Sequence, residues 1–253
     1  MLYYKVYGKS PEKEWLILIH PLGGSSKAFY RQIKEFQKYF NLLTLDLPGH
    51  GRSQDMDILA LNIDTVTKEI YEVLKKENIE STYLLGVCLG NVIVDLLIKE
   101  NRIKIKGVVY GAAVTKLNYF HTFLLNVGKV IKKFSSHSFL YTLFAYIIIP
   151  TQKKSRLIFI AEAKKMKREN FFRWFQLIVE HKNFYNTFNS NSEIPSLYIY
   201  GDEDYLFIKK TKEYIKGKKN KELLVINNSG HMCNIDNFRY FNKVALEFLT
   251  FLN

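Results

Sequence analysis

The chain has 253 residues, of which 47% are hydrophobic and 15% aromatic, so it can bury a large core and global disorder is excluded. Lysine and arginine number 37 against 24 aspartates and glutamates, which gives a net charge of +13. Because basic surfaces attract phosphate and other anions, nucleic acid, an anionic membrane and an anionic substrate all stay open as partners at this point.

Cysteine content and the N-terminal segment indicate the compartment. Two cysteines, Cys88 and Cys233, are too few for a disulfide framework and fit a reducing environment. The first residues lack the basic and then apolar pattern of a signal peptide. The longest apolar run, residues 139–149, is shorter than the ~20 residues that span a bilayer. The sequence therefore predicts a cytoplasmic protein.

Six short apolar runs have the composition of strands that are buried on both faces. They cover residues 15–20, 42–45, 82–85, 107–110, 196–200 and 223–226. Amphipathic helical patterns at residues 26–40 and 59–76 lie between the earlier runs. Strands that alternate with helices predict a parallel sheet with right-handed crossovers.

The alternation is interrupted once. From about residue 115 to residue 192 the chain is helical in character and rich in aromatic side chains, and Pro150 divides this stretch. The strand pattern resumes after Pro195. The sequence therefore predicts an α/β core formed by residues 1–114 and 193–253, with a helical cap (lid) of residues 115–192 inserted into it.

Gly86-Val87-Cys88-Leu89-Gly90 lies between a predicted strand and an apolar helix. This G-x-C-x-G pattern has the strand–turn–helix setting of a nucleophile elbow, whose tight turn requires glycines. The elbow places the Cys88 sulfur at a helix N-terminus, where the helix dipole favours the thiolate. On its own, the pattern also fits an inert cysteine packed into a glycine turn.

Four further loops follow predicted strands. They are His20-Pro21-Leu22-Gly23-Gly24-Ser25, Asp46-Leu47-Pro48-Gly49-His50-Gly51-Arg52-Ser53, Gly201-Asp202-Glu203-Asp204 and Gly230-His231. With these loops and the elbow in this order, the chain resembles the α/β-hydrolase superfamily over essentially its whole length. The resemblance implies the α/β-hydrolase fold, a mostly parallel twisted sheet flanked by helices, with the cap inserted after the sixth core strand. Cysteine stands at the elbow position where most members have serine, a variant that dienelactone hydrolases share.

The resemblance also implies a nucleophile–acid–histidine triad in that chain order. The matching positions are Cys88, Asp204 and His231, and the family spacing G-x-x-D favours Asp204 over Asp202 as the acid. The backbone N–H groups of Leu22 and Leu89 are expected to form the oxyanion hole. Pro21 stands where the family usually has glycine, but the expected donor is the residue after it.

The remaining polar residues of interest have structural interpretations. His20, His50, Asp46 and Arg52 are expected to hold the two loops in which they occur. His121, His137 and His181 have no metal-ligand spacing, and the sequence predicts neither a metal nor a cofactor. Cys233 is expected to be a small buried residue, although a Cys88–Cys233 disulfide that switches activity off is an alternative hypothesis.

The leading functional hypothesis is an acyl hydrolase of the esterase or thioesterase type that forms a covalent acyl-Cys88 intermediate. One alternative is an acyltransferase or condensing enzyme, which passes the acyl group to an amine or alcohol. Another is a non-catalytic ligand-binding protein on the same fold. Aromatic residues of the cap are expected to line an apolar pocket above Cys88.

The basic charge is concentrated in the predicted cap. Residues 115–190 contain 13 lysines and arginines and three glutamates, so this region carries +10 of the net charge. One interpretation is a solvated face that keeps the cap soluble. The other is contact with coenzyme A, an acyl carrier protein or an anionic membrane surface. Nucleic acid is not predicted, because the chain contains no nucleic-acid-binding motif.

Overall fold

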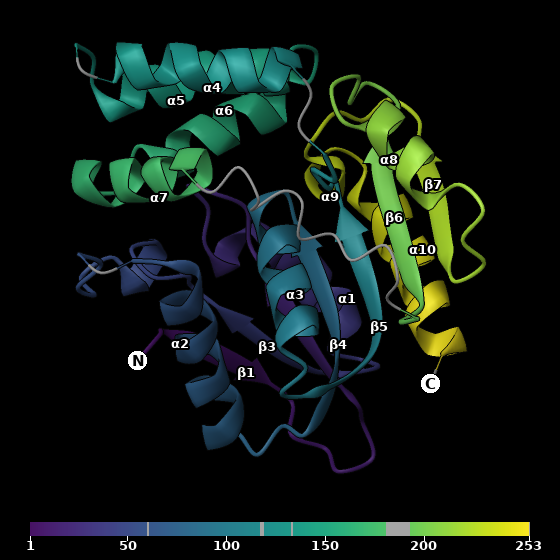
Figure 1. Ribbon diagram of the computed structural model, residues 1–253. Coiled ribbons are helices and arrows are strands. Elements are labelled where there is room, and N and C mark those ends of the chain that lie inside the picture. Colours follow the sequence, from purple (N-terminus) through teal and green to yellow (C-terminus); the bar gives the residue numbers. More distant parts are fainter. Residues whose placement is uncertain (60, 117–118, 133, 181–192, 253) are drawn as a thin grey trace.

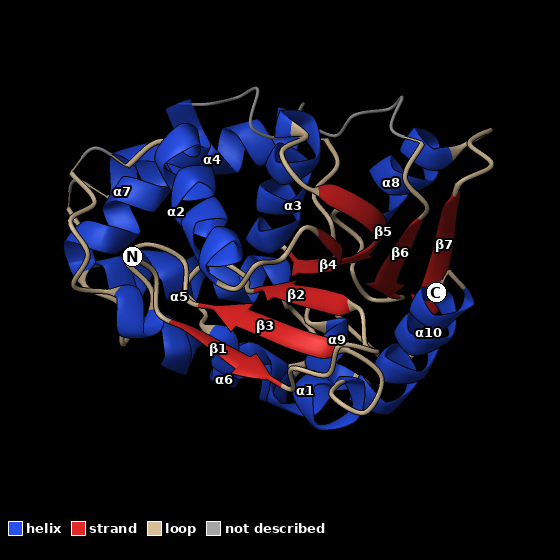
Figure 2. Cartoon of the chain, turned by 90° about the horizontal axis from the view of Figure 1, so that it is seen from below, coloured by secondary structure: helices blue, strands red, loops and turns tan. Residues whose placement is uncertain are grey.

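The computed structural model describes residues 1–59, 61–116, 119–132, 134–180 and 193–252. Within these residues, a seven-stranded sheet has the order β1-β3-β2-β4-β5-β6-β7 (Figure 2). The strands are β1 (Tyr4–Tyr7), β2 (Trp15–Ile19), β3 (Asn41–Leu45), β4 (Ser81–Val87), β5 (Lys104–Gly111), β6 (Ser196–Gly201) and β7 (Lys221–Ile226). Only β1 is antiparallel to its neighbour, and the other pairings are parallel.

Helices cover both faces of the sheet. On one face lie α2 (Ile63–Lys76), α3 (Leu89–Glu100) and α8 (Ile208–Ile215), and on the other lie α1 (Tyr30–Phe36), α9 (Cys233–Asp236) and α10 (Phe238–Phe251) (Figure 2). Two short 3-10 helices, η1 (Ser26–Phe29) and η2 (Gly51–Ser53), belong to loops. The central strands are fully buried, as continuous apolar runs require. The predicted α/β-hydrolase fold, with its mostly parallel sheet between helices, is confirmed.

Four helices follow β5 before the chain returns to the sheet in β6. They are α4 (Tyr119–Ile131), α5 (His137–Ile148), α6 (Lys153–Ala163) and α7 (Arg168–Glu180). Figure 1 shows them together above the carboxyl ends of β4, β5 and β6. Pro150 lies between α5 and α6. The predicted cap boundary at residue 192 lies outside the described residues.

The position of these helices corrects one detail of the prediction. In the described chain they follow the fifth strand and not the sixth. Five strands precede residue 112: the edge strand β1 and the four strands that the apolar runs predicted. The expected number of strands before the cap, six, was therefore one too high. Strand β1 has no continuous apolar run because its side chains are half-buried or exposed at the sheet edge. None of the described helices combines the length and the apolar character needed to cross a bilayer.

Candidate active site

Cys88 stands at the sharp turn between β4 and α3. Its backbone has φ 52° and ψ −113°, a conformation that is strained for a residue with a side chain. Tight packing on both sides fixes the turn. A Cβ atom at Gly86 would lie 2.7 Å from Asn91 Oδ1, and one at Gly90 would lie 2.1 Å from the Ile19 carbonyl oxygen. Gly86 therefore lets α3 pack against the end of β4, and Gly90 lets the start of α3 pack against the end of β2.

His231 and Asp204 form a buried pair beside the elbow. His231 lies in the loop after β7 and Asp204 in the loop after β6, and each side chain is 1% exposed. The Nδ1 atom of His231 lies 2.9 Å from Asp204 Oδ2, so a protonated Nδ1 donates to the carboxylate. The other ring nitrogen, Nε2, has no hydrogen-bond partner of normal geometry among the described residues. It lines the same cavity as the Cys88 side chain.

The environment of His231 favours its charged form. Burial lowers the pKa of His231, but the charges of Asp204 and of a Cys88 thiolate, with the hydrogen bond to Asp204, outweigh burial and raise the pKa to about 10. The Cys88 sulfur thus lies close enough to influence the ring electrostatically. A stabilised imidazolium beside a thiol is suited to hold the proton that a cysteine nucleophile releases.

Asp202, the rival acid, has a different place. Its Oδ1 atom accepts a hydrogen bond of 3.2 Å from the Ser229 backbone N–H and so ties two loops together. The structure brings Asp204 to His231 and leaves Asp202 in a turn. This arrangement agrees with the spacing argument for Asp204.

The two expected oxyanion donors face the same cavity as Cys88. Neither the Leu22 nor the Leu89 backbone N–H has a hydrogen-bond partner in the part of the chain that the structure describes. Both residues line the cavity that contains Cys88. A carbonyl oxygen placed there could therefore accept from N–H groups that folding leaves available.

Tyr141 of α5 holds the loop that carries Leu22. Its hydroxyl donates a hydrogen bond of 2.8 Å to the Leu22 carbonyl oxygen. The loop passes so close that a Cβ atom at Gly23 would lie 2.7 Å from the Tyr141 hydroxyl. The sequence does not predict this role, because Tyr141 is one of many aromatic residues in the predicted cap. The Gly23-Gly24 pair after Leu22 was the only local signal of a close approach.

His20 and Asp46 organise the two loops beside the elbow. The His20 Nδ1 atom donates 2.8 Å to the Pro21 carbonyl oxygen, and its Nε2 atom accepts from the Leu47 N–H at 2.9 Å. The Asp46 carboxylate accepts from the backbone N–H groups of Ser26 and Arg52, at 2.7 and 2.8 Å. These side chains bind backbone groups, as expected from the sequence.

An apolar cavity of about 140 Å³ lies above Cys88, between the sheet and the four helices that follow β5. Its polar side chains are those of Cys88, His231, His121 and Tyr141, and no lysine, arginine, aspartate or glutamate is among its lining residues. The apolar side chains from the helices are Leu124, Leu125, Phe144, Ile148, Phe159, Phe171, Phe175 and Ile178. The cavity is suited to an uncharged hydrocarbon group.

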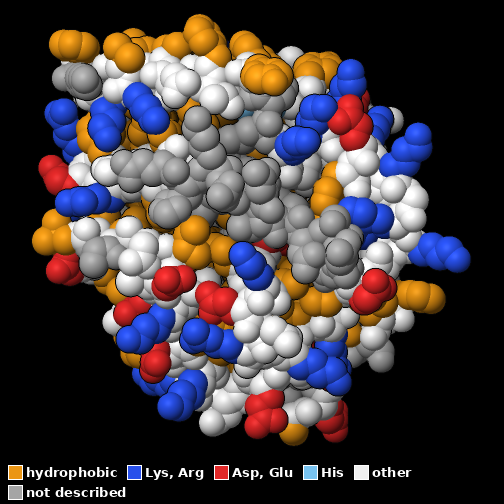
Figure 3. Space-filling model, in the orientation of Figure 1, with side chains coloured by type: hydrophobic (Ala, Val, Ile, Leu, Met, Phe, Trp, Pro, Cys, Tyr) orange, Lys and Arg blue, Asp and Glu red, His pale blue; other side chains and the backbone are white. Residues whose placement is uncertain are grey.

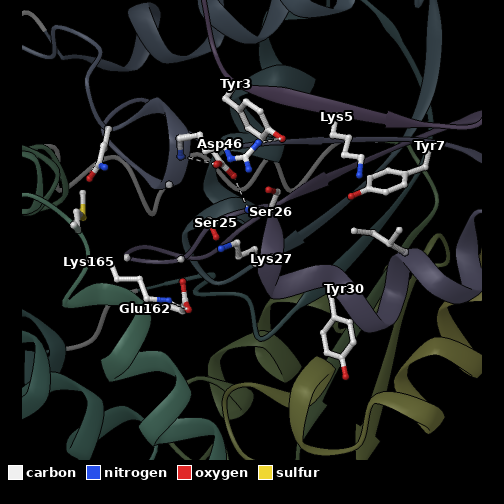
Figure 4. Close-up of a pocket in the computed structure, with 17 residues that line it drawn as sticks. Tyr3, Lys5, Tyr7, Ser25, Ser26, Lys27, Tyr30, Asp46, Glu162 and Lys165 are labelled. Atoms are coloured by element: carbon white, nitrogen blue, oxygen red, sulfur yellow. Dashed lines mark hydrogen bonds and ion pairs between the residues drawn. The ribbon is translucent and has the colours of Figure 1, made fainter.

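A second, polar cavity of about 390 Å³ opens on the outer side of the Gly23-Gly24 loop. Figure 4 shows Tyr3, Lys5 and Tyr7 of the β1 region on one side, and Glu162 of α6 and Lys165 just after that helix on the other. The dashed contacts of Asp46 lie at its edge. None of the lining residues is Cys88, His231 or Asp204, so this cavity is separate from the candidate site.

The other candidate residues have packing roles where the structure describes them. The Cys233 side chain is buried, its thiol lies 3.7 Å from the Ile199 carbonyl oxygen, and both cysteines are free. The His121 ring stacks on Phe207 at 4.9 Å. His181 lies outside the described residues. Among the described residues, no group of three or more His, Cys, Asp or Glu side chains could hold a metal ion.

Comparison with known proteins relates the chain to hydrolases. A family model described as "Serine aminopeptidase, S33" matches residues 10–237. The chain is 36% identical over 87 residues to (E)-2-((N-methylformamido)methylene)succinate hydrolase of Acinetobacter baylyi, and 27% identical over 113 residues to pimeloyl-[acyl-carrier protein] methyl ester esterase of Proteus mirabilis. The aligned segments make up 34% and 44% of this chain and 33% and 40% of those proteins.

The fold is also that of solved structures. MenH from S. aureus superposes with a TM-score of 0.84 over 100% of this chain and 99% of that chain, at 17% sequence identity. At this identity the likeness concerns the fold alone.

Proposed function

The chain belongs to the Hydrolase_4 family (serine aminopeptidase, S33) of α/β hydrolases, and on that premise we propose that it is an acyl hydrolase with Cys88 as its nucleophile. Its substrate class is an ester or thioester. The observation that carries the proposal is the buried His231–Asp204 pair, 2.9 Å apart, whose Nε2 atom is directed to the cavity of Cys88. This pair gives a cysteine at a nucleophile elbow the base that it needs.

The reaction proceeds in two halves. The Cys88 sulfur, whose proton is held by His231, attacks the substrate carbonyl carbon, and the Leu22 and Leu89 N–H groups bind the resulting oxyanion. His231 returns the proton to the leaving alcohol or thiol, which departs and leaves an acyl-Cys88 thioester. Water, deprotonated by His231, then attacks this thioester, and the free acid and the Cys88 thiol are released. Asp204 holds the imidazole in one orientation throughout.

The four helices after β5 supply the acyl pocket in this proposal, as parts of a cap formed by residues 115–192. Their side chains make the cavity apolar, and no lysine or arginine lines it. An acyl group that carries a carboxylate would lose its hydration there without gaining an ion pair. The proposed acyl group is therefore uncharged.

The acyl pocket does not limit the size of the leaving group. The leaving group can therefore be a large carrier. Coenzyme A and an acyl carrier protein are the two candidates, and one relative is by name an esterase for an acyl carrier protein methyl ester. Two lysines of the connection between α6 and α7 are already engaged in ion pairs, Lys165 with Glu162 and Lys167 with Asp55. Charge at these two positions is thus offset locally.

Intact-mass measurement with a panel of acyl thioesters tests the proposal. The wild-type chain should gain one acyl group on Cys88, and the adduct should decay in water to free acid. Cys88→Ala should lose both the adduct and at least 10³-fold in kcat, which is the scale for removal of a covalent nucleophile. Cys233→Ala is the matched control and should keep both.

Each other result has a defined meaning. Full turnover by Cys88→Ala would refute the proposed nucleophile. An adduct that is stable in water but transfers to an added amine or alcohol would identify an acyltransferase. If the chain binds acyl compounds but forms no adduct and shows no turnover across the panel, the result would support a non-catalytic ligand-binding protein.

A further inference from the structure

Helices α4 and α5 are apolar around their whole circumference. Their sequences, YFHTFLLNVGKVI and HSFLYTLFAYII, contain one lysine and no acid. A helix that is hydrophobic on all sides is normally covered on all sides. Here only one side of α4 is packed, because His121 and Gly128 are buried while Tyr119, Phe123 and Val130 are exposed.

The exposed residues form one outer face of the molecule. Seven large side chains of α4, α5 and their connection are about half or more exposed: Tyr119, Phe120, Phe123, Val130, Phe134, Phe139 and Tyr146. We call them the outer face. Tyr119 is 98% exposed and Phe134 85%, so these rings protrude from the surface. Figure 3 shows hydrophobic side chains gathered along the top of the molecule, where Figure 1 places α4 and α5.

The segment that forms this face contains no acidic residue. No aspartate or glutamate occurs in the sequence between Glu100 and Glu162, a stretch that contains both helices. Lys129 is exposed in the last turn of α4, next in sequence to the exposed Val130. Lys132 follows the helix and lies over the ring of Phe172 in α7, so it is not counted here. Protruding aromatic rings with a nearby lysine combine the two attractions that hold a helix at an anionic bilayer.

We propose that the outer face docks on the surface of a bilayer that contains anionic lipids. The rings of Tyr119, Phe123 and Phe134 enter the boundary between headgroups and acyl chains, and Lys129 contacts the lipid phosphates. The helices lie along the surface without crossing it, in keeping with their lengths of 13 and 12 residues. This binding is independent of the reaction at Cys88.

Charge and shape favour a lipid surface over other occupants. A second copy of the chain would bring two acid-free, basic surfaces together, and like charges repel across such a contact. A folded protein partner would have to provide a separate pit for each protruding ring. A bilayer accepts such rings at any position, because its interface is fluid.

Docking would also bring the candidate site close to lipid. The opposite side of α4 lines the cavity above Cys88 through His121, Leu124 and Leu125. Helix α4 is thus a single layer between that cavity and the outer face. An apolar acyl group in the bilayer would have a short path to the pocket.

Co-sedimentation with vesicles tests this proposal without any activity measurement. The full chain should bind vesicles of phosphatidylglycerol and phosphatidylcholine, bind pure phosphatidylcholine at least tenfold more weakly, and lose affinity as salt is raised. The triple variant Tyr119→Ser, Phe123→Ser and Phe134→Ser should lose at least tenfold in partitioning. Lys129→Glu should weaken binding at least fivefold, since one lysine near an anionic surface contributes about a factor of five.

The matched controls are Tyr39→Ser and Phe251→Ser. These variants remove exposed rings that do not belong to the outer face, so vesicle binding should be unchanged. Equal binding of the wild-type chain and the triple variant would overturn the proposal. So would a lipid-free dimer that the triple variant abolishes, because a second copy would then be the occupant. Binding to an acidic carrier protein and not to vesicles would overturn it as well. Circular dichroism of each variant confirms that its fold is retained.

Discussion

At the scale of single residues, the charge state of His231 depends on Asp204. The ring is buried, which disfavours charge, yet its pKa rises to about 10 because the Asp204 carboxylate and the Cys88 sulfur are close. In the unfolded chain the same ring has a pKa near 6.5. Between pH 6.5 and about pH 10 the folded chain therefore holds a proton that the unfolded chain has released.

This difference predicts how stability changes with pH. A group whose folded pKa is raised stabilises the fold below its unfolded pKa, and this contribution falls as pH rises toward the folded pKa. The free energy of unfolding should decrease between pH 6.5 and 10 by up to ~1.4 kcal/mol per pH unit for this one proton. Asp204→Asn removes the main charge that raises the pKa and should abolish most of this slope.

Urea unfolding of wild type and Asp204→Asn at unit steps from pH 6 to pH 10 measures the effect. Other groups titrate in both proteins, so the difference between the two curves isolates His231. Asp202→Asn is the control and should keep the wild-type slope. Parallel curves for wild type and Asp204→Asn would contradict the assigned pair.

At the scale of elements, α7 is fastened to the loop of residues 46–53. The buried Trp174 donates its indole N–H to the Pro48 carbonyl oxygen at 2.7 Å. Asn170, one turn earlier, donates to the carbonyl oxygens of Gly49 and Gln54 at 3.0 and 2.8 Å. A helix of the inserted region thus binds backbone groups of the core loop that Asp46 also holds.

Removal of the Asn170 amide should loosen this attachment. Asn170→Ala leaves two buried or partly buried carbonyl oxygens without their donor, at a cost of about 1–3 kcal/mol in the free energy of unfolding. Chemical denaturation measures the loss. Glu169→Ala, an exposed neighbour on the same helix, should change stability by less than about 0.5 kcal/mol. Similar values for the two variants would show that α7 is not held at this point.

The sequence predicted the elements that carry continuous or periodic apolar patterns. The six predicted strands, β2 to β7, and the elbow follow from local composition, since continuous apolar runs and a tight glycine turn constrain the residues directly. Strand β1 was missed because its side chains are only partly buried. The hydrogen bond between the Tyr141 hydroxyl and the Leu22 carbonyl joins residues that are 119 positions apart in the sequence. Neither a tyrosine nor a leucine at these positions predicts such a contact. Contacts between the inserted helices and the core loops depend on packing, which one sequence does not reveal.

At the scale of the whole molecule, the core and the four helices after β5 build one cavity between them. The core contributes Cys88 and His231 at its floor, and the helices contribute the apolar walls. Its volume of about 140 Å³ is close to that of an apolar protein cavity of about 150 Å³ that binds benzene. The space therefore matches about six carbon atoms.

Substrate preference should follow from this size and polarity. Among unbranched acyl esters, kcat/KM should peak near six carbons. Adipoyl esters with a free carboxylate should react at least 100-fold more slowly than hexanoyl esters, because the unpaired charge would be desolvated. Phe144→Ala, in the wall, should move the optimum to longer chains. Phe139→Ala, exposed on the same helix, should not. Equal rates for adipoyl and hexanoyl esters would contradict the proposed acyl pocket.

His20 and His231 are both buried near the candidate site, and the fold gives them opposite tasks. Backbone groups occupy both ring nitrogens of His20, and burial lowers its pKa, so the ring stays neutral where His231 is charged. The two hydrogen bonds of the His20 ring, which hold the loop that carries Leu22, are therefore not disturbed by protonation of that ring. A change of pH can therefore alter the charge of His231, and with it the reactivity of the site, while the loop that His20 holds keeps its shape.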